Sequence, residues 1–150
     1  MPHFCLPLQA IQVHVMPKED YLLKFIEKLN RVIAAMMGFR EKGFPEDALR
    51  LADEAYTELL SLDLLSLQNM TEAEFKDLLE KHNLNVSYLG HLAEILFQTG
   101  DTYSQLQDKD KAINFYSKSL QTLFFQIGKD KTFSLEREAK ISELKKRIES

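Results

Sequence analysis

The chain has 150 residues, of which 45% are hydrophobic and 28% charged, and its formal net charge is −4. This length suits one domain with its own core, and so small a net charge does not indicate a nucleic-acid ligand. Its single cysteine excludes an intramolecular disulfide, and no stretch reaches the ~18 apolar residues that span a bilayer. We therefore expect a cytoplasmic protein with no membrane partner.

The first fifteen residues differ in character from the rest of the chain. They contain no Lys, Arg, Asp or Glu, and Ile11, Val13 and Val15 alternate with polar residues at the period of a strand. The basic region and small-residue cleavage site of a secretory signal are both missing. We expect residues 1–15 to be a tail of doubtful structure that is dispensable to a single helical domain over residues 16–150.

Helical periodicity is strong after this segment. Apolar residues recur at steps of three and four through two predicted helices, at 21–42 and 45–60. Gly43 is typical of the left-handed residue that ends a helix, and Pro45 is typical of a first helical position. In the insert that follows, Thr71 and Glu74 have the spacing of a capping box and predict a short helix.

Residues 93–124 predict two helices joined by a tight turn at 107–110. Both helices carry an apolar stripe, and Gly100 and Ala112 place small residues where two antiparallel helices touch. Ser87 is expected to cap the first helix of this pair, and Ser134 a final charged helix. We expect the final helix to cover the open face of the pair, as terminal caps do in repeat proteins.

The order of small and large residues in this pair has a known counterpart. Gly100, Tyr103, Ala112 and Tyr116 have the spacing of the tetratricopeptide repeat, and the turn at 43–49 resembles the turn of that repeat. The resemblance implies an all-α fold of antiparallel helical hairpins with about five main helices.

From Met16 onward, the chain also resembles a family of short bacterial proteins of unknown function. The pattern D-Y-x-x-[RK]-x-I-E at residues 20–27 and the leucine-rich stretch at 60–67 are similar to those of the family. The family has no assigned activity, so this resemblance implies a fold and not a function.

In tetratricopeptide repeats, five positions of each first helix line a concave partner-binding surface. The resemblance assigns these positions to Asn30, Ile33, Met37, Arg40, Glu41, Glu94, Phe97, Asp101, Ser104 and Gln105. The candidate partner-binding residues among them are Asn30, Met37, Arg40, Glu94, Phe97, Asp101 and Gln105. Glu94 and Asp101 favour a basic partner, and Asp101 is expected to matter to binding rather than to folding. The alternative is that Ile33, Met37 and Phe97 belong to the core.

Enzyme chemistry finds little support in the sequence. Cys5 lies in the tail, and no nucleophile elbow or phosphate-binding glycine run is present. His91 and Glu94 are one helical turn apart, which leaves a metal-binding or small-ligand domain as the alternative function. We expect no enzyme and no cofactor, and no metal site beyond that alternative.

The predicted function is a protein-interaction or assembly module with an unidentified protein or peptide partner. The lysines near the C-terminus alternate with glutamates, so nucleic acid is not expected. Phe115 and Phe125 lie off the main apolar stripe of their helix, and exposed apolar surface of this kind favours a homo-oligomer.

Overall fold

The computed structural model describes residues 18–150, and these residues form seven α-helices. In chain order they are α2 (Lys18–Glu41), α3 (Pro45–Leu60), α4 (Leu64–Gln68), α5 (Glu72–His82), α6 (Val86–Gln105), α7 (Lys109–Lys129) and α8 (Leu135–Glu149). None of the described residues lies in a strand, so the all-α prediction is confirmed. The number of helices exceeds the five or so expected, and α4 and α5 are the two shortest. The tail prediction for residues 1–15 lies outside the described residues.

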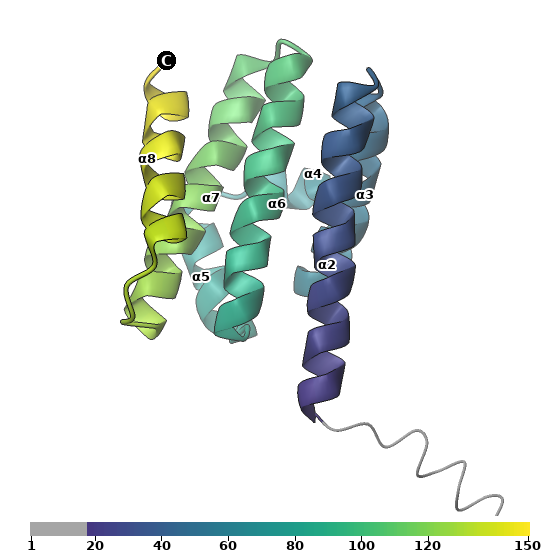
Figure 1. Cartoon of the computed structure of the whole chain (residues 1–150). Helices are drawn as coiled ribbons and strands as arrows, with labels where there is room; N and C mark the ends of the chain where they lie inside the picture. Colours follow the sequence, from purple (N-terminus) through teal and green to yellow (C-terminus); the bar gives the residue numbers. More distant parts are fainter. Residues whose placement is uncertain (1–17) are drawn as a thin grey trace, which may run out of the picture.

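The helices form two layers (Figure 1). In the front layer α8, α6 and α2 lie side by side and run in the same direction. Behind them α3 packs against α2, and α7 packs against both α6 and α8. The insert between the two long pairs places α4 against α3 and both α4 and α5 against α7. The insert therefore covers the side of the core that faces away from the front layer.

Most helix ends follow from local sequence. Gly43 has a φ of 85° after α2, a backbone conformation that glycine adopts without strain, and Pro45 is the first residue of α3. The capping box of Thr71 is present at the start of α5, and the Ser134 hydroxyl accepts the Arg137 N–H at the start of α8. These four predictions are confirmed.

The cap of α6 differs from the prediction. Asn85, and not Ser87, is the N-cap, because the Asn85 Oδ1 accepts the backbone N–H of Ser87 at 2.9 Å. Asparagine and serine are about equally good caps, so the sequence could not decide between positions two residues apart.

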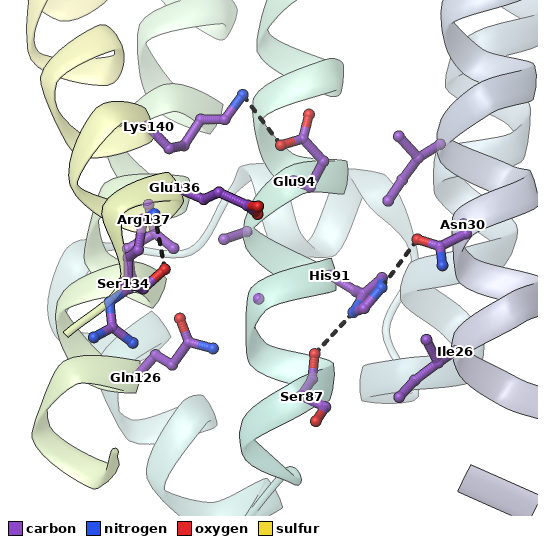
Figure 2. A pocket seen from close by; sticks show the side chains of 14 residues that line it. Ile26, Asn30, Ser87, His91, Glu94, Gln126, Ser134, Glu136, Arg137 and Lys140 are labelled. Atoms are coloured by element: carbon purple, nitrogen blue, oxygen red, sulfur yellow. Dashed lines mark hydrogen bonds and ion pairs between the residues drawn. The ribbon is translucent and has the colours of Figure 1, made fainter. Parts of the chain in front are cut away.

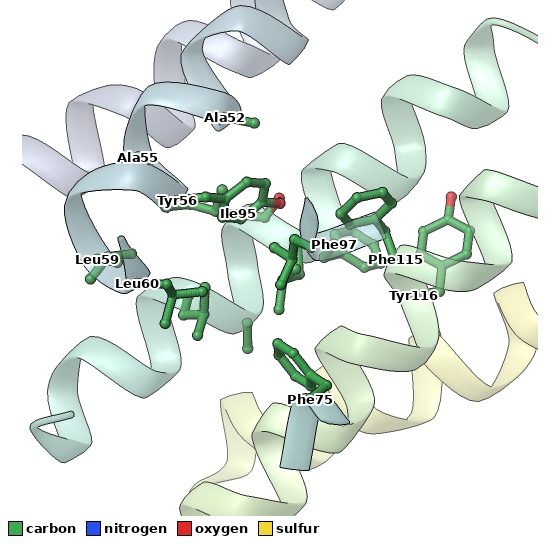
Figure 3. Close-up of a cluster of buried hydrophobic side chains, with 14 of the residues drawn as sticks. Ala52, Ala55, Tyr56, Leu59, Leu60, Phe75, Ile95, Phe97, Phe115 and Tyr116 are labelled. Carbon is green, nitrogen blue, oxygen red and sulfur yellow. The ribbon is translucent and has the colours of Figure 1, made fainter. Parts of the chain in front are cut away.

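The core is one continuous cluster that draws on α2 to α8 (Figure 3). At its centre, Tyr56 of α3 stacks on Phe115 of α7 with ring centroids 6.3 Å apart, and Tyr103 stacks on the same ring at 5.6 Å. The Tyr56 hydroxyl lies 2.5 Å from Thr99 Oγ1, and burial raises the pKa of this phenol. This position for Phe115 corrects the expectation that it is exposed, because Tyr56 of α3 and Tyr103 of α6 both pack against its ring.

The close crossing of α6 and α7 is confirmed at Gly100. A Cβ atom built on Gly100 comes within 2.5 Å of the Tyr116 ring, a distance that real side chains do not adopt. Ala112 on the facing helix is buried. Gly100 therefore makes room for the Tyr116 ring of α7, whose hydroxyl contacts the carboxylate of Asp101 on α6.

Candidate functional site

A pocket of about 520 Å³ opens on the front layer between α2, α6 and α8 (Figure 2). We call it the front pocket. The apolar part of its lining comes mainly from Ile26 and Ile33 of α2 and from Leu123 of α7. Its polar lining residues are Asn30, Ser87, His91, Glu94, Gln126, Ser134, Glu136, Arg137 and Lys140. The pocket therefore combines an apolar surface with side chains that carry both charges.

His91 links α6 to α2 across this pocket (Figure 2). Its Nδ1 lies 2.8 Å from the Ser87 carbonyl oxygen, and its Nε2 lies 3.0 Å from the side-chain amide of Asn30. A carbonyl only accepts, so Nδ1 must carry a proton. The atom that faces Nε2 is Asn30 Oδ1, which also only accepts, so a protonated ring donates from Nε2 to it. A neutral ring keeps this contact only if the Asn30 amide turns and donates from its NH2 group. Both ring nitrogens already have a partner within the chain.

Glu94 belongs to a row of polar contacts that crosses all three helices. Its carboxylate pairs with Lys140 of α8 at 3.1 Å and accepts a hydrogen bond from the Gln98 amide at 2.8 Å. Gln98 in turn accepts a hydrogen bond from the guanidinium of Arg40 on α2. Gln98 is buried, and it was absent from the predicted site. These contacts link α8, α6 and α2 to one another next to the pocket.

Phe97 lies under α8 and is only 5% exposed. The Lys140 ammonium is 3.7 Å from the centre of its ring, and the Arg147 guanidinium is 5.0 Å from it. Cations over an aromatic face are attracted by the negative face of the ring. Phe97 is thus part of the core, as the alternative interpretation held.

Asp101 forms the second junction between α6 and α8. Its carboxylate pairs with Arg147 and accepts the Tyr116 hydroxyl, and its side chain is 14% exposed. Burial first, and then the hydrogen bond to this carboxylate, raises the pKa of Tyr116 to about 12. The carboxylates expected to attract a basic partner are therefore each paired inside the chain, and Asp101 has a structural role that the sequence did not predict.

The remaining predicted residues lie toward the other end of the front layer. The Gln105 amide donates to the backbone carbonyl of Arg40 at 3.1 Å, which joins the ends of α6 and α2. The buried Arg40 Nε has no hydrogen-bond partner among residues 18–150, and Met37 is 41% exposed. Neither these three residues nor Asp101 lines the front pocket; of the predicted set, Asn30 and Glu94 do.

The sequence missed the contribution of α8. Glu136, Arg137 and Lys140 line the front pocket, and Lys140 and Arg147 make the ion pairs to α6. A signal was present: Glu94 and Asp101 are seven residues apart, and so are Lys140 and Arg147. Equal spacing of opposite charges fits two helices that lie side by side, and the pairs Glu94–Lys140 and Asp101–Arg147 show that they run in the same direction.

The structure adds no further metal ligand to His91 and Glu94, the two residues of the alternative metal site, among the described residues. Among residues 18–150, no group of three or more His, Cys, Asp or Glu side chains is placed to hold a metal ion. The ring nitrogens of His91 and the carboxylate of Glu94 have partners of other kinds. A bilayer-spanning helix is likewise not found within these residues.

No protein-family model, no curated protein and no solved structure matches the chain. The resemblances described above therefore stay predictions from the sequence, and the site is interpreted from its own geometry.

Proposed function

We propose that this chain is a non-catalytic protein-interaction module that holds a segment of a partner protein in the front pocket. The observation that carries the proposal is the pocket itself: side chains from four helices converge on one open space of about 520 Å³. Several of them are held by bonds within the chain, as His91 and Glu94 are. A site held in place before binding loses little side-chain entropy when a partner arrives.

The proposal includes a repeat-like architecture. Two helix pairs of similar order, α2 with α3 and α6 with α7, support it, as does the close crossing at Gly100. In a tetratricopeptide-like array the front layer corresponds to the concave, partner-binding side. On this view α8 stands where the first helix of another repeat would follow.

The lining of the pocket favours a particular type of segment. Ile26 and Ile33 offer apolar surface. The Asn30 and Gln126 amides each use one atom within the chain, Asn30 on His91 and Gln126 on the Val86 carbonyl, and the other atom of each amide suits a peptide backbone. The Glu94 and Lys140 charges balance each other, and the Arg137 guanidinium is buried and donates to the Thr132 carbonyl, which leaves Glu136 as the exposed charge. Glu136 points toward α6 in Figure 2 and has no ion pair among residues 18–150. The proposed partner segment therefore carries apolar side chains next to one basic residue.

Display of random peptides on phage, selected against the full chain, tests this function. We expect enrichment of peptides that place Lys or Arg beside apolar residues. The Glu136→Lys variant should bind the selected peptides about tenfold more weakly, because it replaces the attraction with repulsion. Glu138→Lys is the matched control, since Glu138 is exposed on the same helix and does not line the pocket.

Two outcomes would contradict the proposal. One is a selection that enriches no peptide above background. The other is a set of peptides whose affinity is the same for Glu136→Lys, Glu138→Lys and the parent chain.

A further inference from the structure

A second surface lies along α7, where α5 and α8 flank it. Two hollows of about 530 and 460 Å³ adjoin there and share Gln121 and Phe124 in their linings. We call them together the α7 groove. Met70 and Ile148 contribute apolar surface to the first hollow, and Leu79 and Phe125 to the second. Phe124, which both hollows share, is 49% exposed. Side chains from three helices thus surround an accessible aromatic ring.

Lysines surround this apolar surface. Lys76 and Lys129 line the second hollow, and Lys145 of α8 has its ammonium 5.9 Å from the centre of the Phe124 ring. None of these three lysines forms an ion pair within residues 18–150. Elsewhere in the same helices, Lys111, Lys140 and Arg147 all have acidic partners. The α7 groove therefore carries positive charge that the chain itself does not neutralise.

A fourth lysine lies inside the first hollow. Lys118 is 5% exposed, and its ammonium donates to the Met70 carbonyl at 3.0 Å and to the Asn114 amide oxygen at 2.7 Å. Two of its three protons are used in these contacts. The acidic residue in the lining, Glu72, uses its backbone carbonyl to accept a hydrogen bond from Gln121. Over both hollows, three lysines (Lys76, Lys118 and Lys129) and one glutamate (Glu72) line the α7 groove, so its net charge is positive.

The dimensions of the α7 groove correspond to a helix. Its lining residues on α7 extend from Asn114 to Lys129, and sixteen residues of an α-helix measure about 24 Å. An apolar groove of this length takes an amphipathic helix with anchors at i, i+3 or i+4, and i+7.

We propose that the α7 groove binds a short amphipathic helix of a partner protein, with large apolar side chains on one face and carboxylates beside them. The apolar face would cover Phe124, and the carboxylates would pair with Lys76, Lys129 and Lys145. A second copy of the chain fits poorly, because a twofold interface would place these lysines against one another. An anionic membrane fits less well than a helix, because the apolar surface lies in hollows between helices.

Fluorescence anisotropy with the full chain tests the proposal. The probe is a labelled peptide of about 16 residues, with leucine at i, i+3, i+4 and i+7 and glutamate elsewhere, long enough for four helical turns. A peptide of the same composition with leucine at alternate positions serves as the control. We expect the helical probe to bind, the control to bind at least tenfold more weakly, and added salt to weaken the binding of the probe.

Variants of the chain locate the contact. Phe124→Ala and Lys129→Glu should each weaken probe binding by about tenfold or more. Their matched controls are Phe133→Ala, at a 77% exposed ring outside the groove, and Lys24→Glu on α2. Both controls should leave the affinity unchanged, and circular dichroism should show all four variants folded. If Lys129→Glu fails to fold, the affinity of Lys76→Glu for the probe tests the role of the lysine charges instead.

Three results would overturn the proposal. In the first, the probe fails to bind the chain. In the second, the probe binds Phe124→Ala and Lys129→Glu as tightly as it binds the parent chain. In the third, vesicles that contain phosphatidylserine bind the chain through Phe124 while the helical probe does not, which would assign the surface to a membrane.

Discussion

Asp101 shows how one carboxylate can hold two helices together. It is mostly buried, and it accepts contacts from Arg147 of α8 and Tyr116 of α7. Asp101→Lys would place a second cation beside Arg147 and remove the acceptor of the Tyr116 hydroxyl. We expect a loss of about 1–3 kcal/mol in the free energy of unfolding, measured with urea, since a buried partner is left unpaired. Glu138→Lys is the surface control, and an equal midpoint for the two variants would contradict this role.

Gly100 limits how α6 and α7 can approach. Alanine stabilises the interior of a helix by about 1 kcal/mol relative to glycine. At Gly100, however, its methyl group would overlap the Tyr116 ring. We expect Gly100→Ala to lower the free energy of unfolding by about 1–3 kcal/mol through overpacking.

Gly38 of α2 provides the control for that change. A Cβ atom at Gly38 meets nothing within 4 Å, so Gly38→Ala should stabilise the chain by up to about 1 kcal/mol. Opposite signs for the two substitutions in urea unfolding are the expected result. A gain in stability at both positions would mean that the crossing is looser than described.

Tyr116 predicts how stability depends on alkaline pH. Its pKa is raised to about 12 in the folded chain, against about 10 when unfolded. Between these values the folded state keeps a proton that the unfolded state has lost, so the free energy of unfolding falls as pH rises from about 10 to 12. Tyr116→Phe should make this fall shallower, as followed by urea unfolding at several pH values. Tyr21→Phe, at an exposed position, should keep the parent slope.

At the scale of elements, α6 and α8 are joined by a ladder of charges. Glu94 pairs with Lys140 and Asp101 with Arg147, one heptad apart on both helices. A double-mutant cycle with Glu94→Gln and Lys140→Gln measures the first pair. We expect a coupling free energy of about 0.5–1 kcal/mol, because both groups are partly exposed. Strictly additive effects of the two substitutions would show that the pair contributes nothing.

Element boundaries were predictable where one residue has a local physical role. Gly43 and the Thr71 capping box needed no knowledge of the rest of the fold. The helix α4 was not predicted, because five residues are too few to show a helical period, although Asp63 caps it. The side of α7 on which the insert packs was also not predictable, nor was the position of Phe115 between Tyr56 of α3 and Tyr103 of α6. The periodicity of a sequence predicts which face of a helix is apolar. When that face is wide enough to pack on two neighbouring helices, the periodicity does not predict which two helices those are.

The same limit applies to the site. Of the residues predicted for the site, Asn30 and Glu94 line the front pocket. The sequence could not show that α8 neutralises Glu94 and Asp101, since that pairing joins segments more than forty residues apart. Residues assigned to a groove by family register can therefore be structural once a neighbouring helix covers them.

At the scale of the whole molecule, self-association remains a prediction. Phe115 no longer supports it because it is buried, and Phe125 packs partly against the core. Other large apolar side chains are exposed, among them Leu65 and Phe133, and a cyclic dimer is the commonest way to cover such surface. Sedimentation velocity at micromolar concentration should show a dimer. A single species with the mass of one chain would contradict the prediction.

The position of α8 has a consequence during synthesis. The ribosome releases a chain from its N-terminal end, so α2 to α7 emerge before α8 does. Until α8 packs against α6, we expect the outer face of Phe97 to meet water and the carboxylates of Glu94 and Asp101 to lack their cations. The nascent chain thus displays an aromatic surface edged with negative charge, which chaperones that recognise exposed apolar segments can contact. Arrival of Lys140 and Arg147 ends that exposure and completes the front pocket in the same step.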